Sequence, residues 1–338
     1  MTYFRPLVQS GPARPEGAAP LAGGALWFSH AERLERGAPP RVIPAAELPG
    51  DWRDALTAPR APLAGVAMDA PRLMGILNVT PDSFSDGGAH FEPGVAIARA
   101  QAMAQDGADF IDVGGESTRP GSRPLPEDEE IARTAPVIAA LGGKVAAPIS
   151  IDTRKTAVAR AAVEAGAVMV NDVAALTHDP ALAAYCAEAG LPVCLMHMQG
   201  TPETMQEDPR YDDVLLDVFD WLAARIAAAE AAGIPRARIV ADPGIGFGKT
   251  VAHNLALVRG LALFHGLGVP VLLGASRKGF IGKVGGEPEA GRRAPGSIAV
   301  ALAGAARGAQ ILRVHDVAET AQALRLWQAV HHGGEHDA

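Results

Sequence analysis

The sequence has few of the features that mark specialised protein classes. It contains only two cysteines in 338 residues, Cys186 and Cys194, and they form neither a CxxC motif nor a Cys/His metal spacing. A disulfide framework is therefore not indicated, and both thiols are expected in the core. No apolar run reaches the roughly 18 residues of a membrane span, and the N-terminal stretch MTYFRPLVQSGPARPEG has no continuous apolar segment typical of an export signal. We therefore expect a cytoplasmic protein.

Aromatic residues and excess positive charge are also scarce. Aromatic residues make up 5% of the chain and the formal net charge is −8, which argues against a nucleic-acid surface. An anionic ligand must therefore meet a local cluster of basic residues. With 48% hydrophobic and 20% charged residues, the chain can bury a full-sized core, as one large α/β domain or as two smaller ones.

Residues 1–70 differ in composition from the rest of the chain. They hold 10 of the 27 prolines and show no sustained periodicity, but they include Trp27 and Trp52, two of the four tryptophans. Disordered tails are usually poor in such residues. We expect an irregular but folded extension packed on the main domain, with a short helix near Ala31 to Arg36. A proline-rich linker is the alternative.

From Arg72 onward one pattern repeats: a short apolar run, a polar loop and an alanine-rich helical stretch. The apolar runs are RLMGILN, DFIDVGG, VAAPISID, VMVNDV, PVCLMH, RIVADP, VPVLLGA and QILRV. Strands that alternate with helices indicate a parallel sheet. Eight such units fit a (β/α)8 TIM barrel better than an open doubly wound sheet, which more often has about five or six strands. The predicted organisation is an extension over 1–70, a barrel over 71–333 and a tail over 334–338.

Every predicted strand ends on polar or charged residues. These are Asn78, Asp112, Asp152, Asn171 with Asp172, His197, Asp242, Ser276 with Arg277 and Lys278, and Arg313 with His315. Capping of the following helices does not explain the set, because lysine and arginine are not N-cap residues. Barrel enzymes keep their active sites at the carboxyl ends of the strands. We therefore expect these side chains to share one site.

Two motifs invite other interpretations. The stretch DPGIGFGKT has Pro243 where a Walker A loop needs glycine, and its glycines do not have the GxGxxG spacing. We expect it to form a tight turn that places Asp242 and Phe247 at the rim. The stretch MHMQGTP has one histidine, His197, without a second metal ligand at the usual spacing, which argues against zinc. His197 either contacts a ligand directly or makes a structural hydrogen bond.

One half of the expected site suits a flat heterocycle. Asp152, Asn171 and Asp242 offer hydrogen-bond acceptors and Lys278 offers donors. A ring edge with an exocyclic amine beside a ring N–H can bind a carboxylate through two hydrogen bonds. A pterin has such an edge.

The other half suits phosphate oxygens. Arg119, Arg313 and His315 form a cationic group. Asn78 supplies a neutral oxygen that a phosphate-bound Mg²⁺ accepts beside its water ligands. The site is therefore predicted to bind a heterocycle on one side and a polyphosphate on the other.

Several motifs together resemble those of the dihydropteroate synthase family. They are LMGILNVTPDSFSDGG, FIDVGGESTRPG, PISIDT, VNDV, MHMQGTP, DPGIGFGKT, GASRKGFIG and ILRVHDV, and they follow the family's order over nearly all of residues 72–316. The resemblance implies condensation of 6-hydroxymethyl-7,8-dihydropterin pyrophosphate with p-aminobenzoate, Mg²⁺ as cofactor, inhibition by sulfonamides and a homodimer. It does not extend to residues 1–70.

The resemblance also implies roles for individual residues. The pterin contacts are Asp152, Asn171, Asp242, Lys278 and Arg313; the diphosphate contacts are Asn78, Arg119, Arg313 and His315; the p-aminobenzoate contacts are Thr118, Pro120, Phe247 and Ser276. Asn78 is the implied Mg²⁺ ligand. The implied catalytic set is Asn78, Lys278, Arg313, His315 and Arg119. The implied mechanism is dissociative and needs no covalent enzyme intermediate. From their composition, we expect the loops at 80–88 and 116–122 to become ordered only when diphosphate binds.

Two rival functions share part of this pattern. A pterin-barrel methyltransferase serving a corrinoid partner would share Asp152, Asn171 and Asp242, but it would not need the ESTRPG and SRKGF anion elements. A non-catalytic homologue that binds pterin or pyrophosphate is the other possibility. Pyrophosphate release that depends on p-aminobenzoate would distinguish all three.

Overall fold

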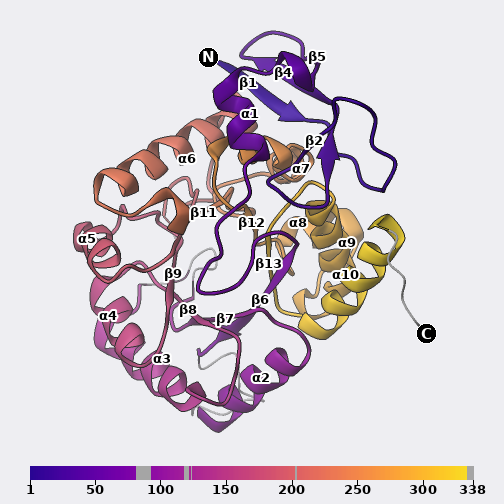
Figure 1. The fold of residues 1–338 in the computed structure, drawn as a ribbon. Coiled ribbons are helices and arrows are strands. Elements are labelled where there is room, and N and C mark those ends of the chain that lie inside the picture. Colours follow the sequence, from indigo (N-terminus) through magenta and orange to yellow (C-terminus); the bar gives the residue numbers. More distant parts are fainter. Residues whose placement is uncertain (81–92, 118–121, 123, 202–203, 333–338) are drawn as a thin grey trace.

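Figure 1 shows the fold in a computed structural model. The structure describes residues 1–80, 93–117, 122, 124–201 and 204–332. The predicted site residues Thr118, Arg119 and Pro120 lie outside the described residues, as do residues 81–88 of the first predicted loop.

Eight parallel strands form the centre of the molecule. They are β6 (Arg72–Asn78), β7 (Phe110–Gly114), β8 (Ile149–Asp152), β9 (Met169–Asp172), β10 (Val193–Met196), β11 (Ile239–Asp242), β12 (Leu272–Leu273) and β13 (Ile311–Val314). Their order is β11-β10-β9-β8-β7-β6-β13-β12. A parallel bridge between Ala241 and Val271 joins the two ends of this order, so the sheet closes on itself. The predicted (β/α)8 barrel is confirmed.

Helices surround the strands (Figure 1). They are α2 (Pro93–Gln105), α3 (Glu127–Leu141), α4 (Thr156–Glu164), α5 (Pro180–Glu188), α6 (Val214–Ala231), α7 (Val251–Arg259), α8 (Gly279–Gly285), α9 (Ala294–Ala305) and α10 (Val317–His332), with 3-10 turns η3 (Arg236–Arg238), η4 (Leu261–Leu267) and η5 (Ala290–Arg292). Side-chain N-caps define where several helices begin: Asp179 and Asp213 cap α5 and α6, and Thr250 caps α7. No helix in the described part of the chain combines the length and apolarity that a membrane crossing requires.

Residues 1–70 form an ordered extension rather than an irregular one. Strands β1 (Thr2–Pro6), β4 (His30–Glu35) and β5 (Arg41–Pro44) make an antiparallel sheet, β2 (Ala19–Pro20) pairs with β3 (Trp27–Phe28), and η1 (Ala45–Glu47) and α1 (Gly50–Thr57) follow. The prediction of a helix near Ala31 to Arg36 is wrong, because this stretch forms strand β4. Pairing with β1 and β5 supplies its backbone partners, and such tertiary pairing overrides local helix propensity.

The extension packs on the side of the barrel and on one of its ends. The Trp52 ring stacks on Phe219 of α6 with a centroid distance of 5.6 Å, and the Tyr3 hydroxyl donates to Asp220 at 2.8 Å. Leu63 and Met68 are buried in an apolar cluster to which seven of the barrel strands each contribute one side chain. These side chains are Met74, Phe110, Met169, Cys194, Val240, Leu272 and Ile311. These seven residues lie toward the amino ends of their strands. The last part of the extension therefore covers the N-terminal end of the barrel. Cys186 and Cys194 are free and buried, as predicted.

Candidate active site

The carboxyl ends of the strands surround a cavity of about 1610 Å³, which we call the mouth cavity. It is lined by seven of the predicted site residues: Asn78, Asp152, Phe247, Ser276, Lys278, Arg313 and His315. Parallel register explains this convergence, because Asn78 pairs with Gly114, Gly114 with Asp152, and Asp152 with Asn171. Asn171 and Asp242 lie at the same rim but are buried.

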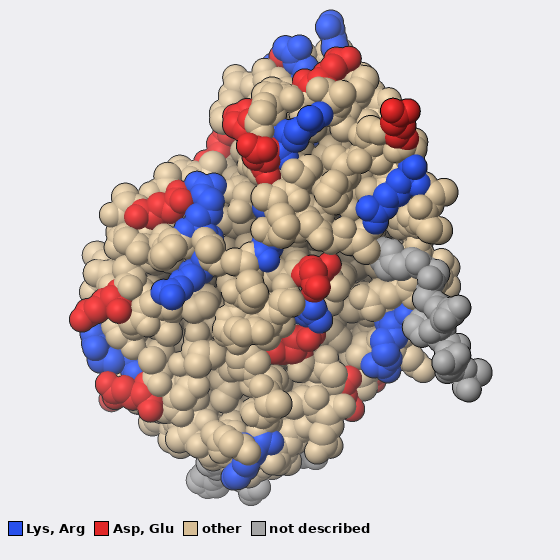
Figure 2. All heavy atoms as spheres, viewed as in Figure 1, with Lys and Arg blue, Asp and Glu red and all other residues tan. Residues whose placement is uncertain are grey.

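The mouth cavity concentrates positive charge on an acidic protein. Eight Lys or Arg residues line it against four Asp or Glu residues, whereas the whole chain carries a net charge of −8. On the face of the molecule that carries the extension, basic and acidic side chains are interspersed and no large patch of one sign is visible (Figure 2). The cavity is therefore the local cluster of bases that an anionic ligand requires.

Arg313 lies at the centre of the polar groups. Its Nε donates to Asp112 Oδ2 at 2.6 Å, and one terminal nitrogen donates to Asp152 Oδ2 at 2.7 Å. Asn171 donates to the same oxygen of Asp112 at 2.9 Å. Burial by itself would lower the pKa of Arg313, but the two carboxylates raise it above its ordinary value. The guanidinium thus stays charged and fixed in orientation.

Asp242 is a buried acceptor at the end of β11. Its Oδ1 accepts a hydrogen bond from the Gly244 backbone N–H at 2.7 Å. Burial raises its pKa to about 6, so the carboxylate is still mostly ionised at neutral pH. Burial also raises the pKa of Asp152. Both carboxyls can accept hydrogen bonds from a flat ligand whose edge carries N–H groups.

Ser276, His315 and Arg277 form the side of the rim beside β13. Ser276 Oγ lies 3.0 Å from His315 Nδ1 and accepts the His315 backbone N–H at 3.2 Å, so it holds the imidazole in place. Burial, followed by the nearby cations of which Arg277 acts most strongly, lowers the pKa of His315 to about 3. His315 was expected to add positive charge, but it is a neutral donor before an anion binds. Arg277 itself pairs with Asp316.

The side-chain oxygens of Asn78 and Asp152 lie near each other at the rim. A Cβ atom placed on Gly114 would lie 3.6 Å from Asn78 Oδ1 and 3.7 Å from Asp152 Oδ2, so both oxygens lie on the same side of the glycine. Within the described ranges, no group of three or more His, Cys, Asp or Glu residues could hold a metal by itself. This donor set fits Mg²⁺, which keeps several waters and takes few protein ligands beside substrate phosphates, and it does not fit a closed structural site.

Known proteins are similar to this chain in both sequence and fold. A family model described as pterin binding enzyme matches residues 74–315. Dihydropteroate synthase from Neisseria meningitidis serogroup B is 48% identical over 270 residues, which cover 78% of this chain and 94% of that protein. The chain belongs to the dihydropteroate synthase family. It is therefore an enzyme, a transferase.

Solved structures of this family agree with the assignment. A Xanthomonas albilineans dihydropteroate synthase with 4-aminobenzoic acid gives a TM-score of 0.76 at 50% identity and covers 81% of this chain and 98% of its own. The X. albilineans enzyme in complex with 7,8-dihydropteroate gives a TM-score of 0.73 at 48% identity and covers 80% and 98%. The family model begins at residue 74 and so does not include the N-terminal extension.

Asp112 was expected at the shared rim, but the sequence did not indicate its partners. It accepts hydrogen bonds from both Arg313 and Asn171. Its Oδ1 is buried and has no hydrogen-bond partner in the part of the chain that the structure describes. A buried unsatisfied acceptor is costly, so this atom suits a donor from a ligand or a water molecule. Its position between Ile111 and Val113, both buried, was the available signal.

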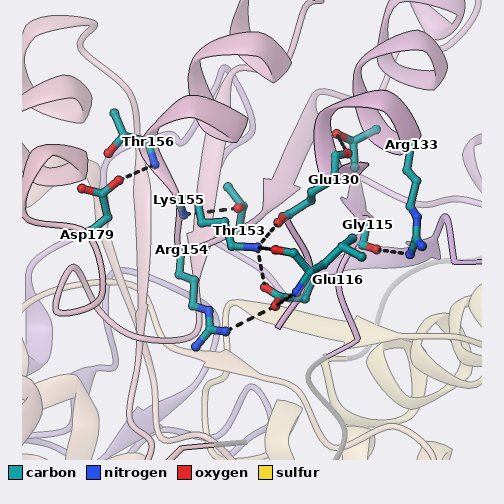
Figure 3. A network of polar contacts seen from close by, with 11 residues as sticks. Gly115, Glu116, Glu130, Arg133, Thr153, Arg154, Lys155, Thr156 and Asp179 are labelled. Atoms are coloured by element: carbon teal, nitrogen blue, oxygen red, sulfur yellow. Dashed lines mark hydrogen bonds and ion pairs between the residues drawn. The ribbon is translucent and has the colours of Figure 1, made fainter. Parts of the chain in front are cut away.

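A buried charge network lies beside the mouth cavity (Figure 3). Lys155 Nζ contacts Glu130 at 2.6 Å, Glu116 at 3.2 Å and the Leu125 carbonyl at 2.6 Å. Glu116 accepts the Leu125 backbone N–H at 2.9 Å and pairs with Arg154 at 3.3 Å. Although burial opposes it, these hydrogen bonds and cations lower the pKa of Glu116. The network fixes residues 116 and 125 relative to each other, and it was not predicted.

His197 makes a structural hydrogen bond, one of the two alternatives drawn from the sequence. It is buried, its Nδ1 lies 2.9 Å from Lys249 Nζ, and its ring packs edge-on against Trp221. Burial and the adjacent lysine lower the pKa of His197 to about 2, so the ring is neutral. Phe247 lies at the rim as predicted, with Lys278 Nζ 4.0 Å from its ring centroid. This is a cation–π geometry.

Proposed function

We propose that this protein is a dihydropteroate synthase that joins 6-hydroxymethyl-7,8-dihydropterin pyrophosphate to p-aminobenzoate in folate biosynthesis. The bond between the pterin methylene carbon and the bridging oxygen breaks, and its electron pair leaves with the diphosphate. The lone pair of the arylamine nitrogen then forms the new C–N bond, and that nitrogen loses one proton. The products are 7,8-dihydropteroate and pyrophosphate. One relative, the X. albilineans enzyme, was solved both with 4-aminobenzoic acid and with 7,8-dihydropteroate, which supports this assignment.

One observation carries the proposal: Arg313 connects an acceptor-rich half of the cavity to a donor-rich half. Asp112 and Asp152 bind the guanidinium, and His315, two residues further along the chain, also lines the cavity. The third guanidinium nitrogen has no partner among the described residues. It can therefore donate to a ligand oxygen. A substrate that joins a heterocycle to a diphosphate matches both halves.

The described residues can bind and orient the pterin before the bond breaks. Asp242 accepts hydrogen bonds from the amino edge of the ring, and the Asn171 side-chain oxygen remains available after its NH₂ group has bonded to Asp112. Donors aimed at developing charge act most strongly where water is excluded. Arg313 and His315 therefore stabilise the negative charge that builds on the leaving oxygen, and Lys278 contacts the pterin. Carboxylates at the pterin half stabilise the positive charge left on the ring system.

Mg²⁺ belongs to the same proposal. Asn78 would hold the ion together with diphosphate oxygens, and the ion would supply neutralisation of charge on the leaving group. Arg119 would complete the anion site, while Thr118, Pro120, Phe247 and Ser276 would contact p-aminobenzoate. Replacing Asn78 by alanine should raise the Mg²⁺ concentration needed for half-maximal rate by at least tenfold. An unchanged Mg²⁺ dependence would remove Asn78 from the metal site.

Assembly, location and inhibition follow the family in this proposal. The protein would be a cytoplasmic homodimer, and sulfonamides would compete with p-aminobenzoate for its pocket. Analytical ultracentrifugation tests the assembly, with a monomer at micromolar concentration as the contrary result. Competition kinetics with a sulfonamide tests the pocket.

The decisive experiment measures pyrophosphate release with both substrates and with each substrate omitted. The proposal requires release that depends on p-aminobenzoate and yields dihydropteroate in equal amount. Methyl transfer to a corrinoid acceptor without pyrophosphate release would favour the methyltransferase alternative. Pterin binding without either reaction would favour a non-catalytic homologue.

A further inference from the structure

Lys249 is a buried lysine to which the proposed mechanism gives no role. It follows the turn after β11, lines the mouth cavity and is only 3% exposed. Burial lowers its pKa to about 7. A buried ammonium group is costly unless it is hydrogen-bonded and paired. Its contacts must therefore offset that cost.

Protein atoms occupy every donor of this ammonium group. Lys249 Nζ lies 2.9 Å from the Phe247 carbonyl oxygen, 2.9 Å from His197 Nδ1 and 3.4 Å from the His197 carbonyl oxygen. A lysine has three N–H donors and no acceptor, so the three contacts match the three donors. His197 must then accept through Nδ1, which agrees with its neutral ring. Lys249 has no donor left for a ligand and can act only through its neighbours.

These contacts join two segments that are already in close contact. A Cβ atom on Gly244 would lie 1.8 Å from the His197 carbonyl oxygen, and one on Gly248 would lie 2.5 Å from the Gln199 carbonyl oxygen. The turn after β11 therefore lies directly against the segment after β10. The carbonyl oxygens of His197 and Phe247 both point at Lys249 Nζ. Two carbonyl oxygens directed at one buried point repel each other unless a cation lies between them.

The residue held in this way is Phe247. Its ring packs with Val173, Met196 and Met205 in an apolar cluster at the rim. The ammonium nitrogen of Lys278 lies 4.0 Å from the centroid of the same ring. A shift of the Phe247 carbonyl would therefore move both the ring and its contact with Lys278.

We infer that Lys249 is a positioning residue for the second substrate: its ammonium group holds the Phe247 backbone so that the ring forms one wall of the p-aminobenzoate pocket. The inference rests on the proposed function, which places Phe247 against p-aminobenzoate. Lys249 touches neither substrate. It should therefore affect the affinity for p-aminobenzoate more than the affinity for pterin.

The test compares Lys249→Met with a matched control, Tyr211→Phe. Methionine keeps the length of the side chain and removes the charge. Tyr211 donates to the Gly248 carbonyl at 2.8 Å, so the control removes a neutral hydrogen bond from the same turn. We would measure kcat and the KM for p-aminobenzoate at saturating dihydropterin pyrophosphate, the Kd for 6-hydroxymethylpterin by calorimetry, and the Tm.

Lys249→Met should raise the KM for p-aminobenzoate at least tenfold and leave the pterin Kd within about threefold. Tyr211→Phe should leave both within about twofold. A changed Tm with an unchanged KM for p-aminobenzoate would mean that Lys249 has only a structural role and would overturn the inference. An equal loss of affinity for both substrates would also overturn it.

A second variant tests the inference independently if Lys249→Met does not fold. His197→Phe keeps an aromatic ring beside Tyr211 and Trp221 and removes the ring acceptor. The same selective rise in KM for p-aminobenzoate is expected, and its absence would contradict the inference. Wild-type protein is assayed first. Lack of pyrophosphate release there would refute the proposed function, whereas a failure confined to the variants would refute only the role of Lys249.

Discussion

Replacing Asp242 by asparagine tests the pterin half of the site with little change of shape. Asp242 Oδ1 accepts the Gly244 N–H at 2.7 Å, and a Cβ atom on Gly274 would lie 3.5 Å from Oδ2. Glycine at position 274 thus leaves space beside Oδ2. Asparagine would keep its oxygen on Gly244 and turn its NH₂ group toward the ligand. A donor would then face the amino edge of the pterin.

The expected loss of binding follows from one charged hydrogen bond. Such a bond contributes about 1.5–3 kcal/mol, and about 1.4 kcal/mol corresponds to a tenfold change in Kd. Pterin affinity should therefore fall roughly tenfold to a hundredfold. In the wild type the affinity should also weaken as the pH falls below about 6, where Asp242 becomes protonated.

The stability of Asp242→Asn should change in the opposite direction. Burial raises the pKa of Asp242 from 3.8 to about 6, so the folded state binds a proton more readily than the unfolded state. The free energy of unfolding therefore falls as the pH rises between these two values, and the penalty persists above pH 6. Asparagine has no such penalty. At pH 7 the variant should be more stable by up to about 3 kcal/mol, because the pKa of Asp242 rises from 3.8 to about 6 on folding. This difference should vanish below about pH 4.

Calorimetry with 6-hydroxymethylpterin and thermal melting at pH 4 and pH 7 measure both effects. Asp208→Asn is the control, because Asp208 also lines the mouth cavity but is exposed and pairs with Arg210. Unchanged pterin binding by Asp242→Asn would refute the assignment of Asp242 as a pterin contact. A loss of binding with no pH dependence in the wild type would refute the account of its charge.

Three further predictions concern other parts of the molecule. Deleting the chain up to Ala70 should lower the Tm and the solubility, because Leu63 and Met68 alone contribute about 3–6 kcal/mol of buried apolar contact; unchanged melting would indicate an independent tail. Asp112→Asn should destabilise the protein by about 3 kcal/mol and lower kcat, since the buried Arg313 loses a charged partner; denaturant unfolding and steady-state kinetics check both, and wild-type values would exclude an anchoring role. p-Aminobenzoate should bind at least tenfold more tightly with pyrophosphate and Mg²⁺ present, a coupling of about 1.4 kcal/mol; equal affinities in a titration would mean a preformed second pocket.

Local patterns in the sequence were sufficient for the barrel and for much of its rim. One of the predicted alanine-rich helical stretches forms α3, Glu127–Leu141, and the run RLMGILN forms β6, Arg72–Asn78. Both follow from periodicity within the segment, which needs no knowledge of distant residues. Because parallel strands all end at one edge of the barrel, the polar strand ends could be assigned to a common site before any distance was known.

Local information failed where partners are far apart in the chain. The stretch HAERLE reads as a helix by composition, but pairing with β1 and β5 makes it strand β4. Asp112 and Arg313 are separated by 201 residues. Strands β7 and β13 both pair with β6, and this long-range pairing brings the two charges to 2.6 Å.

The same limit applies to charge and to burial. Nothing in MHMQGTP or DPGIGFGKT shows that His197 and Lys249 meet in a buried place, where burial lowers the pKa of both groups. The sequence by itself determined which chemical groups arrive at the rim, because strand ends are a property of local pattern. Tertiary structure decided which of them pair, which are buried and which remain open to a ligand, because desolvation and pairing depend on all the elements that close around each side chain.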